Sequence, residues 1–140
     1  MEINGIAHVM LTVSSFDRCV PFYERILIEM GLRTMIKSSE MLYCVGGRTA
    51  VGVIRGDPKY RLERFVQTRI GLHHFCFRAR ERGDIDKIHE VLKEIGAKIV
   101  HAPQDGPWAP GYYSVLFEDP DGIRLEVNHV PGKGLLAEKQ

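Results

Sequence analysis

The sequence has few cysteines and no long apolar run. Its three cysteines, Cys19, Cys44 and Cys76, are odd in number and far apart, and no CxxC pair is present. Neither a disulfide framework nor a thiolate zinc site is therefore indicated. No apolar run approaches the ~18 residues that a membrane helix needs, and the first residues do not form a basic region followed by an apolar one. These absences predict a reduced, cytoplasmic protein with no membrane partner.

An excess of charge of one sign is also missing. Lysine and arginine total 19 residues against 18 aspartates and glutamates, which gives a formal net charge of +1. This balance predicts no nucleic-acid partner and favours a small-molecule substrate. The chain has 140 residues, of which 44% are hydrophobic and 26% charged. That length and composition are typical of one domain that buries a core, so we expect a single domain over residues 1–140.

The order of predicted elements repeats along the chain. His8 and His74 are 66 residues apart, and the helix-ending glycines Gly31 and Gly96 are 65 residues apart. Hydrophobic periodicity and turn residues predict one βαβββ module in each half. Module one, at about 3–55, has a strand at 6–13, a helix at about 16–30 and strands at about 33–37, 41–45 and 49–55. Module two, at about 71–130, has a strand at 72–79, a helix at 84–95 and strands at 98–101, 112–117 and 123–130.

Two such modules predict an α+β fold. One βαβββ module cannot bury its own apolar face, so tandem copies are expected to pack as two curved mixed sheets around a cleft. The polar stretch at about 56–70 connects the modules. The tail at 131–140 is expected either to fray or to lie on a partner.

Three side chains on predicted strands have the chemistry of metal ligands. His8 and His74 lie at equivalent positions of the first strand in each module, and Glu126 lies on the last strand. Two imidazoles and one carboxylate suit iron, manganese, zinc, nickel or cobalt, and they leave metal positions open for substrate. The alternative for Glu126 is a salt bridge to Arg124 or Arg78. By strand alternation His73 is expected to point away from His74, as a packing or surface residue.

Three segments in the right order carry a resemblance to a known family. They are 6–11 (IAHVML), 71–77 (GLHHFCF) and 118–126 (EDPDGIRLE). Together they resemble the vicinal oxygen chelate superfamily, which includes glyoxalase I, methylmalonyl-CoA epimerase, extradiol dioxygenases, fosfomycin-resistance enzymes and bleomycin-resistance proteins. The resemblance covers about residues 3–130. It implies one divalent metal ion bound by His8, His74 and Glu126.

The sequence departs from individual family members in two places. Glyoxalase I has a fourth ligand on the last strand of module one, where this chain has Val51, Gly52 and Val53. Extradiol dioxygenases and fosfomycin transferases carry a tyrosine three residues before the turn aspartate, where this chain has Leu116. Tyr112 and Ser114 lie on the same predicted strand face as Leu116 and are candidates to replace that tyrosine.

Two classes of function follow from the resemblance. The first is a metal-dependent lyase, isomerase or dioxygenase, in which Glu126 acts as a weak base and Tyr112, Ser114 or Tyr43 donates a proton or orients the substrate. The second is a protein that binds an antibiotic or another small ligand without catalysis, as bleomycin-resistance members do. The resemblance also implies a homodimer, with the ligands of one site coming from both subunits.

Overall fold

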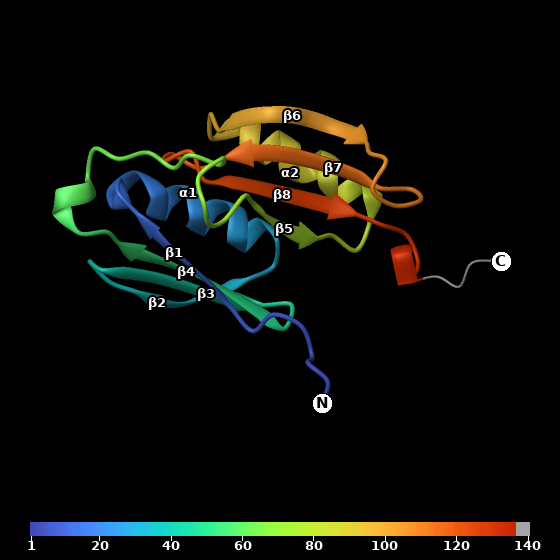
Figure 1. The fold of residues 1–140 in the computed structure, drawn as a ribbon, viewed down its shortest axis with the longest axis horizontal. Helices are drawn as coiled ribbons and strands as arrows, with labels where there is room; N and C mark the ends of the chain where they lie inside the picture. Colours follow the sequence, from blue (N-terminus) through green and yellow to red (C-terminus); the bar gives the residue numbers. More distant parts are fainter. Residues whose placement is uncertain (137–140) are drawn as a thin grey trace. The chain divides into compact units, whose positions relative to one another are not determined.

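The computed structural model describes residues 1–136 and contains two compact units, one at residues 1–65 and the other from Val66 onward. Each unit has the order βαβββ, with a four-stranded mixed sheet and one long helix (Figure 1). The predicted α+β fold of two tandem modules is thereby confirmed. Among residues 1–136, no helix has the length and apolar character that a membrane crossing requires.

The first unit contains a sheet in the order β1-β4-β3-β2. Strand β1 is parallel to β4, and the other neighbours are antiparallel. The predicted first strand was too long at its start, although Ala7 still accepts a hydrogen bond of 2.9 Å from the Ala50 N–H. The elements are β1 (Val9–Val13), α1 (Phe16–Glu29), β2 (Arg33–Lys37), β3 (Met41–Gly46) and β4 (Thr49–Arg55).

Helix α1 covers one face of this sheet. Its buried stripe includes Tyr23, Ile26 and Leu27, each with no exposed surface. Strand residues that point to the same side are equally buried, since alternate positions of a strand share a face. Pro21 lies inside the helix, where its missing N–H leaves the carbonyl of Asp17 without the usual helical hydrogen bond.

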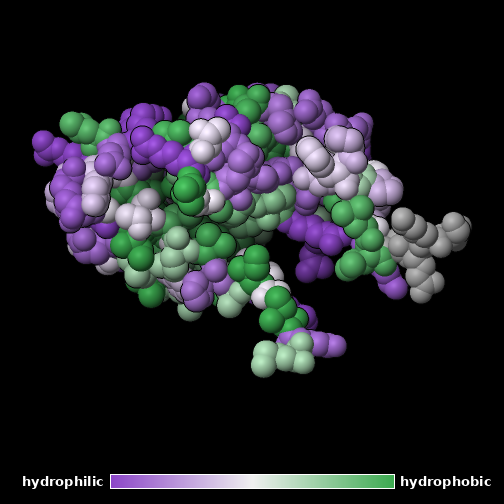
Figure 2. All heavy atoms as spheres, viewed as in Figure 1, coloured by the Kyte–Doolittle hydropathy of each residue, from purple (hydrophilic) through white to green (hydrophobic). Residues whose placement is uncertain are grey.

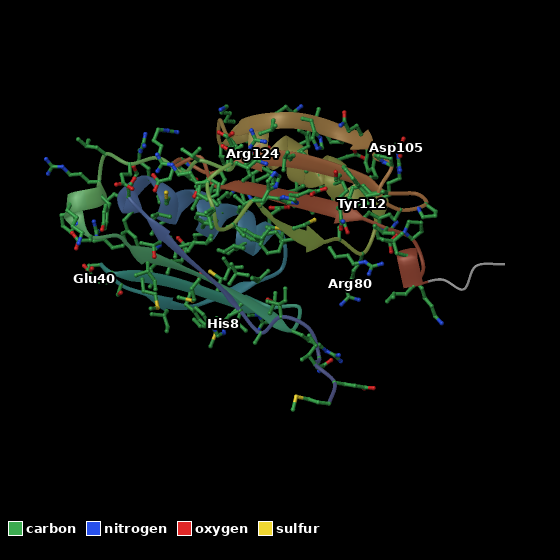
Figure 3. The ribbon with its side chains drawn as sticks, viewed as in Figure 1. His8, Glu40, Arg80, Asp105, Tyr112 and Arg124 are labelled. Carbon is green, nitrogen blue, oxygen red and sulfur yellow. The ribbon has the colours of Figure 1, made fainter. Side chains whose placement is uncertain are left out.

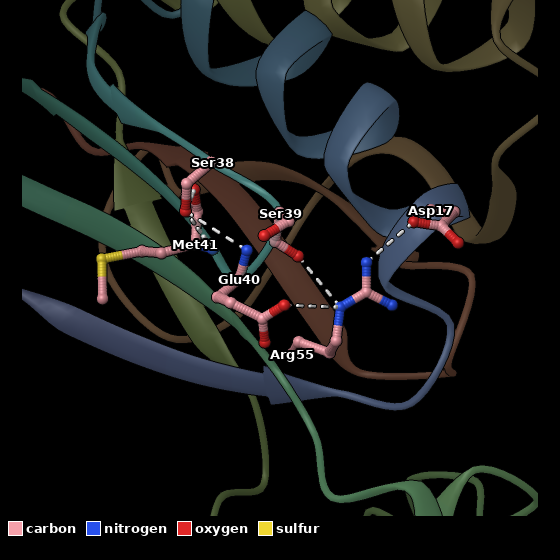
Figure 4. A network of polar contacts seen from close by, with 6 residues as sticks. All are labelled: Asp17, Ser38, Ser39, Glu40, Met41 and Arg55. Carbon is pink, nitrogen blue, oxygen red and sulfur yellow. Dashed lines mark hydrogen bonds and ion pairs between the residues drawn. The ribbon is translucent and has the colours of Figure 1, made fainter.

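Arg55 ties the end of β4 to α1 and to the β2–β3 turn (Figure 4). Its Nη2 lies 3.1 Å from Asp17 Oδ1, and its Nε donates to the Ser39 carbonyl at 2.9 Å. The guanidinium also lies 4.4 Å from the centre of the Phe16 ring. The turn is closed by Ser38, whose Oγ accepts hydrogen bonds from the two backbone N–H groups that follow Ser39.

The face of this sheet opposite α1 is apolar. Met10, Gly52, Tyr43 and Ile36 form one row across the four strands. Met10 and Ile36 are exposed, and hydrophobic atoms are visible at the surface over these strands (Figure 2). A Cβ added at Gly52 would lie 2.4 Å from the Met10 sulfur. The methionine side chain therefore lies directly over the glycine.

The second unit repeats the arrangement, with the sheet order β5-β8-β7-β6 and β5 parallel to β8. Strand β6 is longer than predicted and includes Pro103. Proline is tolerated there because β6 is an edge strand, where one side needs no hydrogen-bond partners. The elements are β5 (Phe75–Arg78), α2 (Arg82–Glu94), β6 (Lys98–Asp105), β7 (Tyr113–Glu118) and β8 (Arg124–His129).

Helix α2 begins two residues before its predicted start. Glu81 precedes the helix and forms a capping box with Asp84, whose carboxylate accepts a hydrogen bond of 3.2 Å from the Glu81 N–H. Asp84 is therefore the third helical residue and not the first. Short 3-10 helices also occur at Pro58–Tyr60 and Gly134–Leu136. Of the predicted tail, residues 137–140 lie outside the described part of the chain.

The turn between β7 and β8 is built around Asp119, which is buried. Its Oδ1 accepts hydrogen bonds from the Asp121 N–H at 2.9 Å and from the Ile123 N–H at 2.8 Å. Gly122 has a φ of +91°, a conformation that favours glycine. This turn fixes the start of β8 and hence the register that places Glu126.

Candidate metal centre

Glu126 and His74 lie together on the second unit. In the parallel pair, Cys76 on β5 is in register with Glu126 on β8, and His74 lies directly before β5. Its Nε2 is 3.2 Å from Glu126 Oε2. The His74 side chain is 34% exposed and the Glu126 side chain only 10% exposed. Because Leu125 and Val127 point toward α2, Glu126 lies on the opposite face of the sheet, away from α2.

Tyr112 holds the other oxygen of this carboxylate, since its hydroxyl donates a hydrogen bond to Glu126 Oε1. The loop before β7 fixes the tyrosine: its N–H donates to the Ala109 carbonyl and its own carbonyl accepts from the Gly106 N–H. A Cβ at Gly106 would lie 3.0 Å from Tyr112 Cδ1, so the ring packs closely over this glycine. Burial and the bond to Glu126 raise the pKa of Tyr112 to about 12.

The predicted alternative, a salt bridge from Glu126 to arginine, does not occur among the described residues. Arg124 pairs with Glu118, with Nε 3.4 Å from Oε1. Arg78 donates to the backbone carbonyls of Val130 and Gly132, at 3.1 and 3.4 Å. A carboxylate in this partly desolvated position normally pairs with a cation or binds a metal. Among residues 1–136, the groups beside the Glu126 carboxylate are the imidazole of His74, the phenol of Tyr112 and the thiol of Cys76, and none is an arginine or a lysine.

Cys76 lies beside Glu126 in the sheet. Desolvation and the negative charge of Glu126 raise the pKa of the Cys76 thiol to about 12. The sulfur therefore stays protonated at neutral pH, and a thiolate is not among the donors beside Glu126 in metal-free protein.

Ser114 lies farther along the same face. It is buried and sits opposite Asn128 in the β7–β8 pair, whereas Leu116 sits opposite Glu126. Among residues 1–136, Ser114 makes no side-chain hydrogen bond to Glu126. Of the two candidates for the family tyrosine, the structure thus brings only Tyr112 to the carboxylate.

His8 belongs to the first unit. It is exposed and directly precedes β1 (Figure 3). In the same way, His74 directly precedes β5. Both histidines therefore enter a strand that is parallel to the last strand of its own module. Val51 and Val53 are buried on the α1 side of the sheet. Of the three residues where a fourth ligand was sought, only Gly52 lies on the face away from α1, and it has no side chain.

The donors on the second unit fit part of a metal site. Two ligand atoms, each about 2.0 to 2.2 Å from a common ion at ordinary bond angles, lie about 3 Å apart. The separation of His74 Nε2 and Glu126 Oε2 agrees with this value. Within either unit of residues 1–136, no three histidine, cysteine, aspartate or glutamate side chains gather at metal-binding distance. Among the described residues, the second unit therefore supplies two candidate ligands and no third.

Sequence reasoning misplaced His73. Its Nδ1 lies 2.7 Å from His74 Nδ1, although alternation predicted opposite directions. The reason is that β5 begins only at Phe75, so the backbone at 71–74 is not extended in the regular way. Gly71, with a φ of +136°, marks the irregular backbone and was the available signal.

The sheet topology and these donor positions define a class of protein. Residues 5–127 match the family model described as the Glyoxalase/Bleomycin resistance protein/Dioxygenase superfamily. The chain belongs to this superfamily.

Individual relatives are similar over nearly the whole chain. Metallothiol transferase FosB of Shouchella clausii (strain KSM-K16) is 28% identical over 137 residues, which cover 98% of this chain and 85% of FosB. YqjT of Bacillus subtilis (strain 168), an uncharacterized protein, is 26% identical over 86% of this chain and 94% of its own length. A crystal structure from Bacillus halodurans, assigned provisionally to the glyoxalases, has a TM-score of 0.79 and 26% identity, with coverage of 91% and 96%.

Proposed function

We propose that this protein is a divalent-metal-dependent enzyme that acts on a small oxygenated substrate. His8, His74 and Glu126 are the proposed ligands. The observation that carries the proposal is the 3.2 Å approach of His74 Nε2 to Glu126 Oε2, with Glu126 Oε1 held by Tyr112 and no arginine or lysine at this carboxylate among residues 1–136. A group arranged in this way presents a nitrogen and an oxygen toward one point.

The protein side chains divide the work between them. A bound divalent ion would supply Lewis-acid polarisation of two neighbouring substrate oxygens. Tyr112 keeps its proton at neutral pH because its pKa is raised to about 12, so its hydroxyl can donate to a developing negative charge on the substrate. Glu126 Oε1, which accepts the hydrogen bond from that hydroxyl in the free protein, is the proposed weak base. Ser114 is the proposed orienting residue farther along the same face.

The phenol of Tyr112 favours an enzyme over a simple binder. Leu116 occupies the position directly opposite Glu126, where related dioxygenases and transferases are expected to carry a tyrosine. Tyr112 brings a phenol to the same carboxylate from four residues earlier in the chain. A protein that only encloses an apolar ligand has no need of this replacement.

Metal analysis tests the proposal. Protein purified without chelator or a metal-affinity tag, then loaded with Mn²⁺, Fe²⁺, Co²⁺, Ni²⁺ or Zn²⁺ in turn, should retain close to one equivalent of one of these ions per chain. Variants His8→Ala, His74→Ala and Glu126→Gln should each lose most of it, whereas the control His89→Ala on α2 should not. Full loading of all three ligand variants, or no retention by the wild type, would contradict the proposal and favour ligand binding without catalysis.

Turnover assays then separate the reactions. The panel consists of catechols with dioxygen, methylglyoxal–thiol adducts, and epoxide antibiotics with a thiol. The last reaction is included because of the similarity to FosB, a metallothiol transferase. Turnover only with iron or manganese and dioxygen would indicate a dioxygenase, whereas turnover with redox-inactive zinc would indicate a lyase, isomerase or transferase.

The proposed oligomer is a homodimer in which His8 of one subunit completes the site of the other. Mixing His8→Ala protein with His74→Ala protein should then restore up to one intact site per mixed dimer. Sedimentation velocity on the same samples reports the dimer. If the mixture forms dimers but does not regain metal binding, all three ligands come from one chain.

A further inference from the structure

A chain of side-chain hydrogen bonds lies behind His74, on the side away from Glu126. His73 Nδ1 is 2.7 Å from His74 Nδ1, and the Gln67 amide hydrogen-bonds to the ring nitrogens of His73. The two imidazole rings are 5.0 Å apart, at an interplanar angle of 71°. His74 is thus held at both nitrogens: Nδ1 contacts His73 and Nε2 faces Glu126.

The chemistry of imidazole gives this contact a direction. Only one proton can lie between the two Nδ1 atoms, so one ring donates and the other accepts. A histidine that binds a cation through Nε2 carries its proton on Nδ1 and normally donates it to a neighbouring acceptor, which fixes the ring. Nδ1 of His73 is in the place of that acceptor. His73 then carries its own proton on Nε2. The Gln67 atom beside that ring is the amide nitrogen. Turning the amide by 180° exchanges this nitrogen for the side-chain oxygen, which accepts the His73 proton.

We infer that His73 is a positioning residue, which with Gln67 orients the imidazole of His74 so that Nε2 faces Glu126. The inference rests on the proposed role of His74 as a metal ligand. The inference gives a role to the His73 side chain, which is exposed and which strand alternation would point away from His74. It also connects the segment between the modules, through Gln67, to the orientation of a ligand.

Two substitutions at His73 separate hydrogen bonding from ring packing. His73→Phe keeps an aromatic ring against His74 but removes both nitrogens. His73→Asn removes the ring but keeps a polar atom close to the position of Nδ1. His89→Phe is the matched control, because His89 lies on α2 with its Nδ1 4.0 Å from Glu90 Oε1 and takes no part in the chain of hydrogen bonds.

The first measurement uses metal-free protein. Long-range ¹⁵N–¹H correlation spectra of the His74 ring should show one dominant tautomer in the wild type and in His73→Asn. In His73→Phe they should show a mixture of tautomers, with thermal unfolding and circular dichroism unchanged. A His74 spectrum that is the same in His73→Phe as in the wild type would overturn the inference whether or not the protein binds metal.

The second measurement is the affinity for Co²⁺, followed by its visible absorption. His73→Phe should weaken binding by about 10-fold to 100-fold, the usual effect of losing a partner of a metal-binding histidine. His73→Asn and His89→Phe should stay within a few-fold of the wild type, and Gln67→Leu should weaken binding less than His73→Phe. If His73→Asn weakens binding as much as His73→Phe, ring packing matters and the inference fails. If the wild type binds no Co²⁺ or other ion, the proposed function fails, while the spectra of metal-free protein still decide the role of His73.

Discussion

The hydroxyl of Tyr112 donates a hydrogen bond to Oε1 of Glu126 and thereby joins the segment before β7 to the middle of β8. This bond orients the carboxylate so that its other oxygen faces His74. Four predictions follow from this site and from the turns and glycines that support the two sheets.

Tyr112→Phe should remove a tyrosine that ionises at unusually high pH. In metal-free protein the pKa of Tyr112 is raised to about 12, above the value of about 10 for an unfolded chain. The resulting contribution to the free energy of unfolding is complete below about pH 10 and is lost as the pH rises through about 12. Absorbance at 295 nm should therefore show one fewer group titrating near pH 12 in the variant.

The same pair of proteins gives a stability test. The difference in unfolding free energy between the wild type and Tyr112→Phe should shrink as the pH rises from 10 to 12. A constant difference for Tyr112→Phe would show that the phenol is not held by Glu126.

Two glycines on neighbouring strands should respond differently to alanine. A Cβ at Gly46 would lie 2.9 Å from Leu32 Cα and 3.0 Å from the Gly31 carbonyl oxygen, and backbone atoms cannot easily move aside. Gly46→Ala should lower the free energy of unfolding by about 1 to 3 kcal/mol. At Gly52 the closest obstacle is the flexible end of Met10 at 2.4 Å, and the edge of the Tyr43 ring lies at 3.1 Å. Both are side chains that can move, so Gly52→Ala should cost less than Gly46→Ala, about 1 kcal/mol.

Urea unfolding of both variants checks this difference. A double variant, Met10→Ala with Gly52→Ala, removes the contact with Met10 and leaves the one with Tyr43. The glycine substitution should therefore cost less in the Met10→Ala background than in the wild type. Equal destabilisation by Gly46→Ala and Gly52→Ala would contradict the distinction between backbone and side-chain neighbours.

Asp119→Ala should destabilise the turn that leads into β8. The substitution leaves the N–H groups of Asp121 and Ile123 without their carboxylate acceptor. Each lost acceptor costs about 1 to 3 kcal/mol where the donor is buried. Chemical unfolding should therefore show a total loss of about 2 to 6 kcal/mol. Asp119→Asn keeps an oxygen at the same position, so its loss of stability should be less than half of the loss in Asp119→Ala.

Cys76 should react slowly with alkylating agents. A thiol whose pKa is about 12 has little thiolate at pH 8, and the thiolate is the reactive form. Mass spectrometry of iodoacetamide-treated, metal-free protein should show slow labelling of Cys76 in the folded state and rapid labelling after unfolding. Glu126→Gln removes one cause of the raised pKa and should accelerate labelling, while desolvation of the thiol, the larger cause, keeps the rate below that of the unfolded chain.

Most of the fold was predictable because periodicity and turn residues mark each element. Strands β2 and β4 have the bounds that their alternation and flanking turns predict. The ends of elements were harder, since they depend on long-range pairing: β6 continues through Pro103 only because it is an edge strand. The start of α2 was misplaced because Glu81 is an unusual capping residue, and Asp84 resembled the cap.

The candidate site was predictable in chemistry but not in detail. The equivalent positions of His8 and His74 and the turn before Glu126 were visible in the sequence. The contact of Tyr112 with Glu126 depends on the loop that begins at Gly106, and loop geometry has no periodic signal. The contact of His73 with His74 was mispredicted because alternation holds only inside a strand. Strand β5 starts at Phe75, one residue after His74.

The two module-opening histidines directly precede the first paired residues of β1 and β5, Val9 and Phe75, although Ala7 also bonds the Ala50 N–H. Replacing either imidazole would thus disturb no pairing between strands and little of the apolar interior. Substitution can therefore remove or restore either imidazole while the scaffold stays the same. A superfamily built on such an arrangement can include catalysts and inert binders that share one architecture.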